Sequence, residues 1–305
     1  MLHVTNGTSV SLDRSGLGGE ILVWRDVLHE GPVPEGLDLD DLTRLRAKFL
    51  ESIWPGNADS AEDSLAGRDA TLGRFAGHDD VTLWFEHDLF DQLQLIQILD
   101  WFRARQGGAA RLSLICIDNY LGTLTGEQLA ELWPARHAVT VEELDLAAAA
   151  WRAFRAPDPT AIEELLRQDT SALPFLAGAL LRHLQQFPSV ENGLSRTERQ
   201  IMELVEAGVH RLPELFCADR RREERIFMGD ASFDRYVRGL GECRHPLLID
   251  EHGYYTLTPT GRDVLATYVD HVRLNGINRW LGGVHLDGGE ARWRWDERRG
   301  SLVPH

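Results

Sequence analysis

The chain has 305 residues, of which 43% are hydrophobic, and a formal net charge of −16. This length suits about two domains, and the sequence has no apolar run long enough to span a membrane, which excludes an integral helical membrane protein. The N-terminus lacks the basic and apolar regions of a signal peptide. The three cysteines, Cys116, Cys217 and Cys243, are too widely spaced for a zinc motif or a disulfide framework. We therefore expect a globular protein of the reducing cytoplasm.

The negative charge is concentrated in the first part of the chain. Residues 1–194 carry 15 Lys and Arg against 30 Asp and Glu, whereas residues 195–305 carry 17 against 18. An acidic surface repels the backbone of a nucleic acid unless a metal ion or a basic patch intervenes. The charge therefore disfavours nucleic acid as a partner of the N-terminal part.

Residues 1–122 alternate apolar strand patterns with amphipathic helical patterns. Strands are expected at 2–5, 20–24, 81–85 and 111–117, and helices at 38–54, at 69–75 and from Asp91 onwards. The polar stretch 55–68 indicates a loop or a short helix, and Gly107 and Gly108 are expected to break the chain before the last strand. This alternation predicts an α/β domain with a mostly parallel sheet in a three-layer, Rossmann-like arrangement.

Polar side chains follow each of these predicted strands. They are Asn6 and Gly7 after the first, Asp26, His29 and Glu30 after the second, Glu86, His87 and Asp88 after the third, and Asp118 and Asn119 after the fourth. The carboxyl ends of parallel strands lie at one edge of the sheet, where α/β proteins bind their ligands. We therefore expect these side chains to line one site.

The turn after the third strand is the richest in charge. Glu86 and Asp88 are the expected ligands of a divalent cation, Mg²⁺ or Mn²⁺, since carboxylates suit such ions, with Asp91 and Gln92 as neighbouring ligand-binding groups. Because successive residues of a strand point to opposite sides, at most two of residues 86–88 face one site. The structural alternative is that Asp88 or Asp91 caps the next helix while His87 fills a polar gap.

Four residues of this edge are the candidates for catalysis: Asp26, Glu30, Glu86 and His87. Metal-assisted hydrolysis is the reaction class that carboxylates and an imidazole suit best, and acid–base catalysis by Asp26 and Glu86 is a second interpretation. An ion pair between Arg25 and Asp26 would explain Asp26 without any function.

The remaining candidates, Asn6, Gly7, His29, Asp118 and Asn119, are assigned to ligand binding. A turn at Asn6-Gly7 offers backbone N–H groups to an anion, and a phosphate-bearing or nucleotide-like small molecule is the expected ligand. The chain has no G-x-G-x-x-G or Walker pattern. An Asx-turn explains Asp118 and Asn119 equally well, and homo-oligomerisation is left open.

The C-terminal part predicts a different architecture. Residues 123–193 indicate a helical connector, with helices at 141–154, 161–168 and 173–187. Residues 194–274 indicate a winged helix-turn-helix-like α+β domain, with helices at 195–205, 213–217 and 230–241, a hairpin of 246–250 with 254–258, and a closing helix at 260–273. Residues 275–305, rich in tryptophan, indicate one further hairpin.

The expected recognition helix, residues 230–241, is not basic: it carries Asp230 and Asp234 beside Arg235 and Arg238. Helices that read a major groove usually bring surplus positive charge. We therefore expect this domain to serve packing or dimerisation. The alternative function of the whole chain is a ligand-sensing transcriptional regulator or a protein-interaction module.

Several motifs resemble one bacterial family. The segments HVTNG at 3–7, WRDVLHEGP at 24–32 and LWFEHDLFDQLQL at 83–95 resemble the family known as domain of unknown function 1835. The segments FMGD at 227–230, LTPTG at 257–261 and NGINRWLGGVHL at 275–286 are similar to the segment that often follows it. The resemblance implies a bacterial cytoplasmic protein and brings no activity. At Thr8, where the family often has an acidic residue, this chain departs from the pattern, which weakens a metal role for the first loop.

Overall fold

The computed structural model describes residues 1–7, 9–55, 60–105 and 110–305. The chain divides into two compact units: Met1–Ala179 with Gly282–Val284, and Leu180–Leu281 with His285–His305. The finer boundaries at 122, 193 and 274 remain predictions. The expectations for Thr8 and for the break at Gly107-Gly108 fall outside the described residues.

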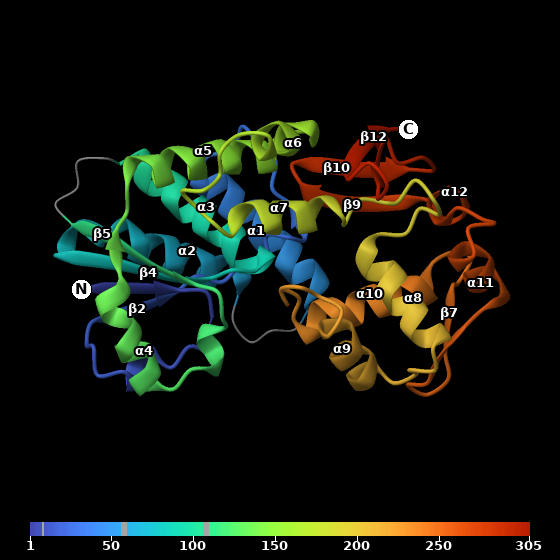
Figure 1. Cartoon of the computed structure of the whole chain (residues 1–305), viewed down its shortest axis with the longest axis horizontal. Coiled ribbons are helices and arrows are strands. Elements are labelled where there is room, and N and C mark those ends of the chain that lie inside the picture. The colour runs from blue at the N-terminus through green and yellow to red at the C-terminus, as the bar shows by residue number, and fades with distance from the viewer. Residues whose placement is uncertain (8, 56–59, 106–109) are drawn as a thin grey trace. The chain divides into compact units, whose positions relative to one another are not determined.

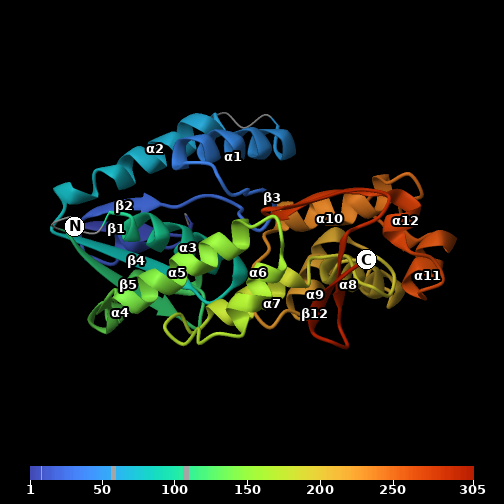
Figure 2. The ribbon, with the colours of Figure 1, turned by 90° about the horizontal axis from the view of Figure 1, so that it is seen from above.

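The first unit contains a five-stranded, mostly parallel sheet (Figures 1 and 2). Its strands are β1 (Leu2–Thr5), β2 (Glu20–Val23), β4 (Asp80–Glu86), β5 (Arg111–Ile117) and β6 (His137–Ala138), in the spatial order β2-β1-β4-β5-β6. The first four are parallel and β6 is antiparallel to β5. The four predicted strands and the mixed α/β class are confirmed. Two two-residue strands, β6 and β3 (Gly31–Pro32), were too short to leave a sequence pattern.

Strand β4 is the centre of this sheet, and its residues from Val81 to Glu86 are all buried. Trp84 packs in an apolar cluster with Ile115 of β5 and Leu121 beyond it, and its indole N–H donates to Nδ1 of His3 at 3.1 Å. A strand enclosed on both faces holds the backbone of its last residue, Glu86, in a fixed place.

The α-helices described in the first unit or at its boundary are α1 (Leu39–Ile53), α2 (Ala61–Gly73), α3 (Leu89–Arg103), α4 (Gly126–Leu132), α5 (Val141–Arg155), α6 (Thr160–Leu166) and α7 (Leu176–Leu184), the last of which contains the unit boundary. Short 3-10 turns are η1 (Leu12–Arg14), η2 (Phe75–Gly77), η3 (Leu121–Thr123) and η4 (Trp133–Ala135). Helices α3 and α5 run side by side, as Figures 1 and 2 show.

Two helix predictions in this unit need correction. Helix α2 is one continuous helix, where a loop or a short helix followed by a separate helix at 69–75 was expected, because Ser60 caps it and Leu65, Arg68 and Leu72 form a buried face at helical spacing. Helix α3 begins at Leu89, before Asp91, because the carboxylate of Asp88 accepts the backbone N–H of Asp91 as an N-cap. Helix α1 begins after Asp38, as predicted.

The second unit combines helices with short strand pairs. Its elements are α8 (Arg196–Glu206), α9 (Leu212–Arg220), α10 (Asp230–Glu242), β7 (Leu248–Asp250), β8 (Tyr255–Leu257), α11 (Pro259–Leu265), α12 (His271–Asn275), β9 (Ile277–Gly282), β10 (Val284–Gly288), β11 (Trp293–Asp296) and β12 (Ser301–Pro304). Helix α8 begins as predicted, where Ser195 and Glu198 form a capping box, and β7 and β8 pair antiparallel as expected.

The end of this unit differs from the prediction. The expected closing helix is two helices, because Thr267 has a φ of 64° and Asp270 starts a new helix as its N-cap. The tail forms two strand pairs, β9 with β10 and β11 with β12, instead of one hairpin. Within the described ranges, no helix is both long and apolar enough to cross a membrane.

Candidate functional site

The strand order places the reversal point of the sheet between β1 and β4. From β1 the chain continues to β2 on one side, and then crosses to β4 on the other side of β1. In open α/β sheets, ligands bind outside the carboxyl ends of the strands at such a reversal. The residues at these two ends are Asn6, which follows β1, and Glu86, which ends β4.

Helix α3 starts at this reversal and adds two more carboxylates. Asp88 is its N-cap, and Asp91 is on its first turn. One carboxylate oxygen of Asp91 accepts the backbone N–H of Glu86 at 2.8 Å, and the other accepts the side-chain amide of Asn6. A single carboxylate therefore connects the ends of β1 and β4 to the start of α3.

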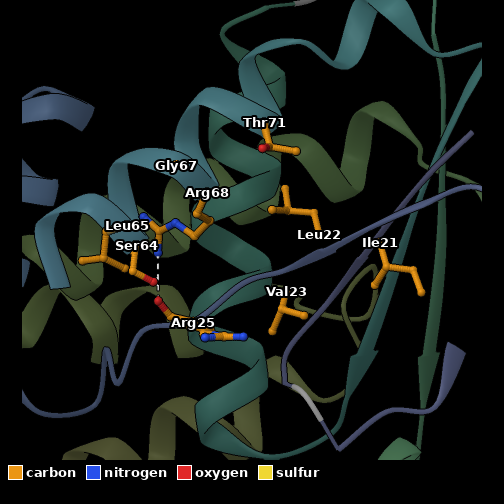
Figure 3. Close-up of a pocket in the computed structure, with 9 residues that line it drawn as sticks. All are labelled: Ile21, Leu22, Val23, Arg25, Ser64, Leu65, Gly67, Arg68 and Thr71. Atoms are coloured by element: carbon orange, nitrogen blue, oxygen red, sulfur yellow. Dashed lines mark hydrogen bonds between the residues drawn. The ribbon is translucent and has the colours of Figure 1, made fainter. Parts of the chain in front are cut away.

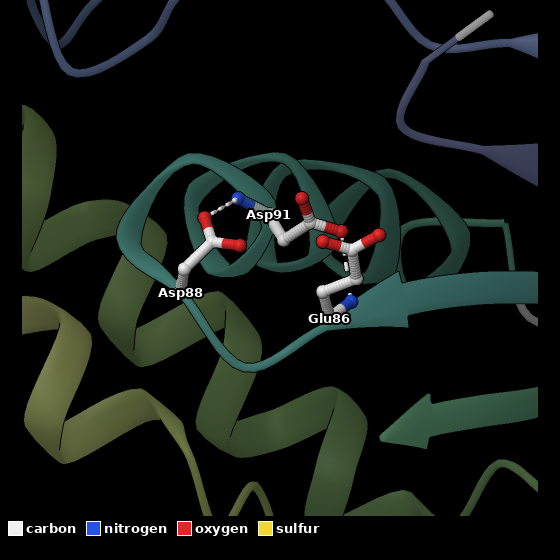
Figure 4. Close-up of side chains that lie close together, drawn as sticks. All are labelled: Glu86, Asp88 and Asp91. Carbon is white, nitrogen blue, oxygen red and sulfur yellow. Dashed lines mark hydrogen bonds between the residues drawn. The ribbon is translucent and has the colours of Figure 1, made fainter. Parts of the chain in front are cut away.

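Glu86, Asp88 and Asp91 form one compact carboxylate cluster (Figure 4). One carboxylate oxygen from each lies within 4.8 Å of the other two, and the side chains are buried, with exposed fractions of 6%, 2% and 1%. Two oxygens bound to one divalent cation lie at most about 4 Å apart at the Mg²⁺ distances of about 2.0–2.1 Å, and at most about 5 Å apart at the Ca²⁺ distances of about 2.3–2.6 Å. The spacing of the cluster is therefore close to that of oxygens around a shared cation.

The cluster lacks a positive partner in the part of the chain that the structure describes. Its hydrogen bonds come from backbone N–H groups and an amide: Leu121 donates to Oε1 of Glu86 at 2.7 Å, besides the bonds of Asp91 and Asp88 given above. No Lys or Arg in the described ranges forms an ion pair with any of the three carboxylates. Three buried negative charges without a counter-charge are costly.

The pKa values reflect this arrangement. Burial and the negative charge of Glu86 raise the pKa of Asp88 to about 7. Burial and the charges of Asp88 and Glu86 raise the pKa of Asp91 well above its ordinary value. Burial also raises the pKa of Glu86, against hydrogen bonds from the backbone of Leu121 and Gly122 and from the side chain of Asn6. Without a cation, the cluster therefore retains protons at pH values where ordinary carboxylates are fully ionised.

These shifts predict a pH dependence of stability in the metal-free protein. The folded state keeps a proton on Asp88 up to a pH of about 7, whereas the unfolded chain loses it near the ordinary aspartate pKa of 3.8. The folded state therefore binds more protons in this window, and its unfolding free energy falls as the pH rises, by up to about 1.4 kcal/mol per pH unit for one group.

This slope can be measured by urea unfolding with a chelator between pH 4.5 and pH 7.5, in wild type and Asp88→Asn. The variant keeps an N-cap but has no proton to lose, so it should show a shallower decline. Equal slopes in the two proteins would contradict the attribution of this pH dependence to Asp88.

His87 lies apart from the cluster, as expected for successive residues of an extended segment. Its ring packs against Tyr120 and Phe175, with centroid distances of 5.0 and 6.0 Å. Its Nε2 lies 3.9 Å from a carboxylate oxygen of Asp118, whose side chain is 69% exposed. The chain therefore places His87 and Asp118 together.

Asp26 has a different partner from the one predicted. Its carboxylate is paired with Arg46 of α1, at 2.7 Å from one Nη and 3.1 Å from Nε, and not with Arg25, which is exposed. Arg46 also donates to the backbone carbonyls of Val27 and Glu30, at 2.9 and 2.6 Å. Asp26 is thus held in a buried ion pair, which explains it without proton transfer.

The other predicted residues lie around these groups. Glu30 lies 3.7 Å from the ring of His29, which packs on Phe90 in the first turn of α3. Gln92 donates to the backbone carbonyl of Glu86 at 2.7 Å and so supports the end of β4. Asn119 accepts the N–H of Tyr120 at 2.8 Å, which fits the structural alternative. Gly7 follows Asn6 beyond the end of β1.

Two residues that hold these carboxylates, Leu121 and Arg46, were not predicted from the sequence. The backbone N–H of Leu121 carries no side-chain signature, so its bond to Glu86 could not be read from residue types. Arg46 did leave a signal, because it stands on the buried face of α1 with Leu42, a position where arginine needs an acidic partner.

No protein-family model, curated protein or solved structure matches this chain.

Proposed function

We propose that the first unit binds a divalent cation, Mg²⁺ or Mn²⁺, through Glu86, Asp88 and Asp91. The observation that carries this proposal is the burial of three carboxylates within 4.8 Å of one another, without a basic partner in the described ranges. A set of oxygen ligands without thiolate or imidazole suits a hard cation. The position at the reversal of strand order supports a ligand site over a purely structural one.

We further propose that the cation helps to hold a phosphate-bearing or nucleotide-like small molecule, and that the protein is a binder or hydrolase of such a molecule. A divalent cation in such a site neutralises phosphate charge and lowers the pKa of a bound water. Asn6 would contact the ligand, since its Oδ1 has no hydrogen-bond partner within the described residues. His87, beside Asp118, is the residue we assign to proton transfer. We do not assign Asp26 to catalysis, because its carboxylate forms an ion pair with Arg46.

We also propose a Rossmann-like arrangement for the first unit, a winged helix in the second unit, and membership in the domain of unknown function 1835 family. The parallel order of β1, β2, β4 and β5 supports a Rossmann-like arrangement, and the sequence α8, α9, α10, β7, β8 supports a winged helix. Membership in the domain of unknown function 1835 family rests on the motifs given above. Arg238 of α10 is paired with Asp234 at 3.1 Å, and this pairing does not favour DNA binding by α10.

A thermal-shift screen with nucleotides tests the ligand part of this proposal. With Mn²⁺ present, a nucleotide should stabilise the wild-type protein further, and this increment should vanish with a chelator and in Asp88→Asn. A nucleotide that stabilises Asp88→Asn as much as wild type would show that its site does not depend on the carboxylate cluster.

A further inference from the structure

Strand β2 leaves one edge of the sheet unpaired. It is the outermost strand, with β1 as its neighbour on the other side. The N–H groups of Glu20 and Trp24 donate to the carbonyls of Met1 and Thr5, at 3.1 and 2.7 Å, so the alternate residues, Ile21 and Val23, direct their N–H and C=O groups away from β1. In the described part of the chain, no hydrogen bond reaches these outward groups of Ile21 and Val23.

A groove runs along this edge, and helix α2 forms its other wall (Figure 3). We call it the β2–α2 groove. Its volume is about 300 Å³, and its lining includes Ile21, Val23, Arg25, Gly67 and Arg68. Natural sheets usually cover or twist away an open edge to prevent unwanted pairing. An uncovered edge in a hollow is therefore suited to receive a strand.

The helical wall leaves space for such a strand. Gly67 stands between Ser64 and Thr71 on the side of α2 that lines the groove. A Cβ atom added at Gly67 would meet no atom within 4 Å. A side chain longer than alanine at this position would therefore extend into the groove without disturbing the packing of α2.

The carboxyl end of β2 gives the groove its charge. The guanidinium of Arg68 stacks on Trp24, at 3.9 Å from the ring centroid, and donates to the carbonyl of Arg25 at 3.1 Å. Pairing along the edge therefore ends at Arg25. The side chain of Arg25 is exposed and forms no ion pair among the residues the structure describes, although the protein as a whole carries a net charge of −16.

We propose that the β2–α2 groove binds an extended acidic peptide segment of a partner protein, which adds a strand to β2. The peptide backbone pairs with the outward groups of Ile21 and Val23 at the usual strand spacing of about 4.8 Å. An acidic side chain of the peptide pairs with Arg25, and small or apolar residues alternate with it. A single strand is favoured over a second copy of this chain, because a second copy would bring its own α2 to the same edge.

The test measures fluorescence anisotropy with two labelled, end-capped pentapeptides, Thr-Val-Asp-Val-Thr and Thr-Val-Lys-Val-Thr. Wild type should bind the aspartate peptide at least about tenfold more tightly than the lysine peptide, and Arg25→Glu should reverse this preference. Equal affinity for the two peptides in wild type, or no binding of the aspartate peptide at about 1 mM, would overturn the proposal.

Two pairs of variants separate groove binding from other causes. Gly67→Leu fills the groove and should weaken binding at least about tenfold, whereas Gly67→Ala should keep binding and raise the melting temperature, since alanine is the better helix former. Val23→Pro removes one outward N–H while leaving the ladder to β1 intact, and Val23→Ala keeps that N–H. If Val23→Pro does not fold, the Gly67 pair decides.

Three results would show that the groove does not bind an acidic peptide strand. Unchanged peptide binding in Gly67→Leu would place the peptide elsewhere. Full competition by N-acetyl-aspartate at equal concentration would indicate a site for small carboxylates. A concentration-dependent dimer that Gly67→Leu abolishes, in a protein that binds neither peptide, would indicate a second copy of this chain. Each of these results contradicts strand addition by a partner.

Discussion

Asp26→Ala is expected to lower the unfolding free energy by about 3–5 kcal/mol, the cost of leaving a buried charge without its partner. Asp26 and Arg46 are only 3% and 1% exposed. Arg46 cannot turn towards solvent, because it also donates to the carbonyls of Val27 and Glu30. Equilibrium unfolding in urea measures the loss.

An exposed ion pair on the same helix provides the matched control. Asp41 pairs with Arg44 on α1, with side chains 51% and 55% exposed, and such pairs contribute less than about 1 kcal/mol. Asp41→Ala should therefore be nearly neutral. Similar losses for Asp26→Ala and Asp41→Ala would contradict the structural assignment of Asp26. If the prediction holds, a loss of activity in Asp26→Ala is no evidence for a catalytic role, because the loss of stability explains it.

Asp88→Asn is expected to stabilise the metal-free protein at pH 8 by about 1–3 kcal/mol, because it removes one of three buried negative charges. Asparagine caps helices as well as aspartate does, so the bond to the N–H of Asp91 is kept. Urea unfolding with a chelator gives the value. The gain in stability should come with a loss of stabilisation by Mn²⁺.

Asp38→Asn is the control for this change. Asp38 is the N-cap of α1 and accepts the N–H of Asp41 at 2.8 Å, in the same way that Asp88 serves α3, but at an exposed site. Its replacement should change stability by less than about 0.5 kcal/mol. An Asp88→Asn protein that is less stable than wild type without metal would show that the carboxylate of Asp88 is needed for the fold itself.

The sequence was sufficient for features that depend on local pattern. The apolar runs that become β1, β4 and β5 are contiguous, and the capping residues Asp38 and Ser195 stand directly before their helices. Local pattern failed where a charged residue replaced an apolar one. Arg68 belongs to the buried face of α2, because its guanidinium stacks on Trp24, and this obscured the helix.

The site itself depended on long-range order that no local pattern contains. Asn6 and Asp91 are far apart in the sequence, and only the placement of β1 beside β4 brings them into contact. The same holds for Asp26, whose partner Arg46 lies on the next helix and not on the neighbouring residue. The residue types at the strand ends predicted a polar edge of the sheet. Which side chains of that edge come into contact depends on the order of the strands, and this order could not be read from the sequence.

Calorimetric titration of the chelator-treated protein with Mn²⁺ decides whether the carboxylate cluster binds a cation. One Mn²⁺ site per chain is expected in wild type and in Asp38→Asn, and an affinity reduced at least about 100-fold in Asp88→Asn. Saturation at about 100 times the dissociation constant should also raise the unfolding free energy by about 2.7 kcal/mol. If wild type binds no Mn²⁺, or Asp88→Asn binds it equally well, the carboxylate cluster is not a metal site.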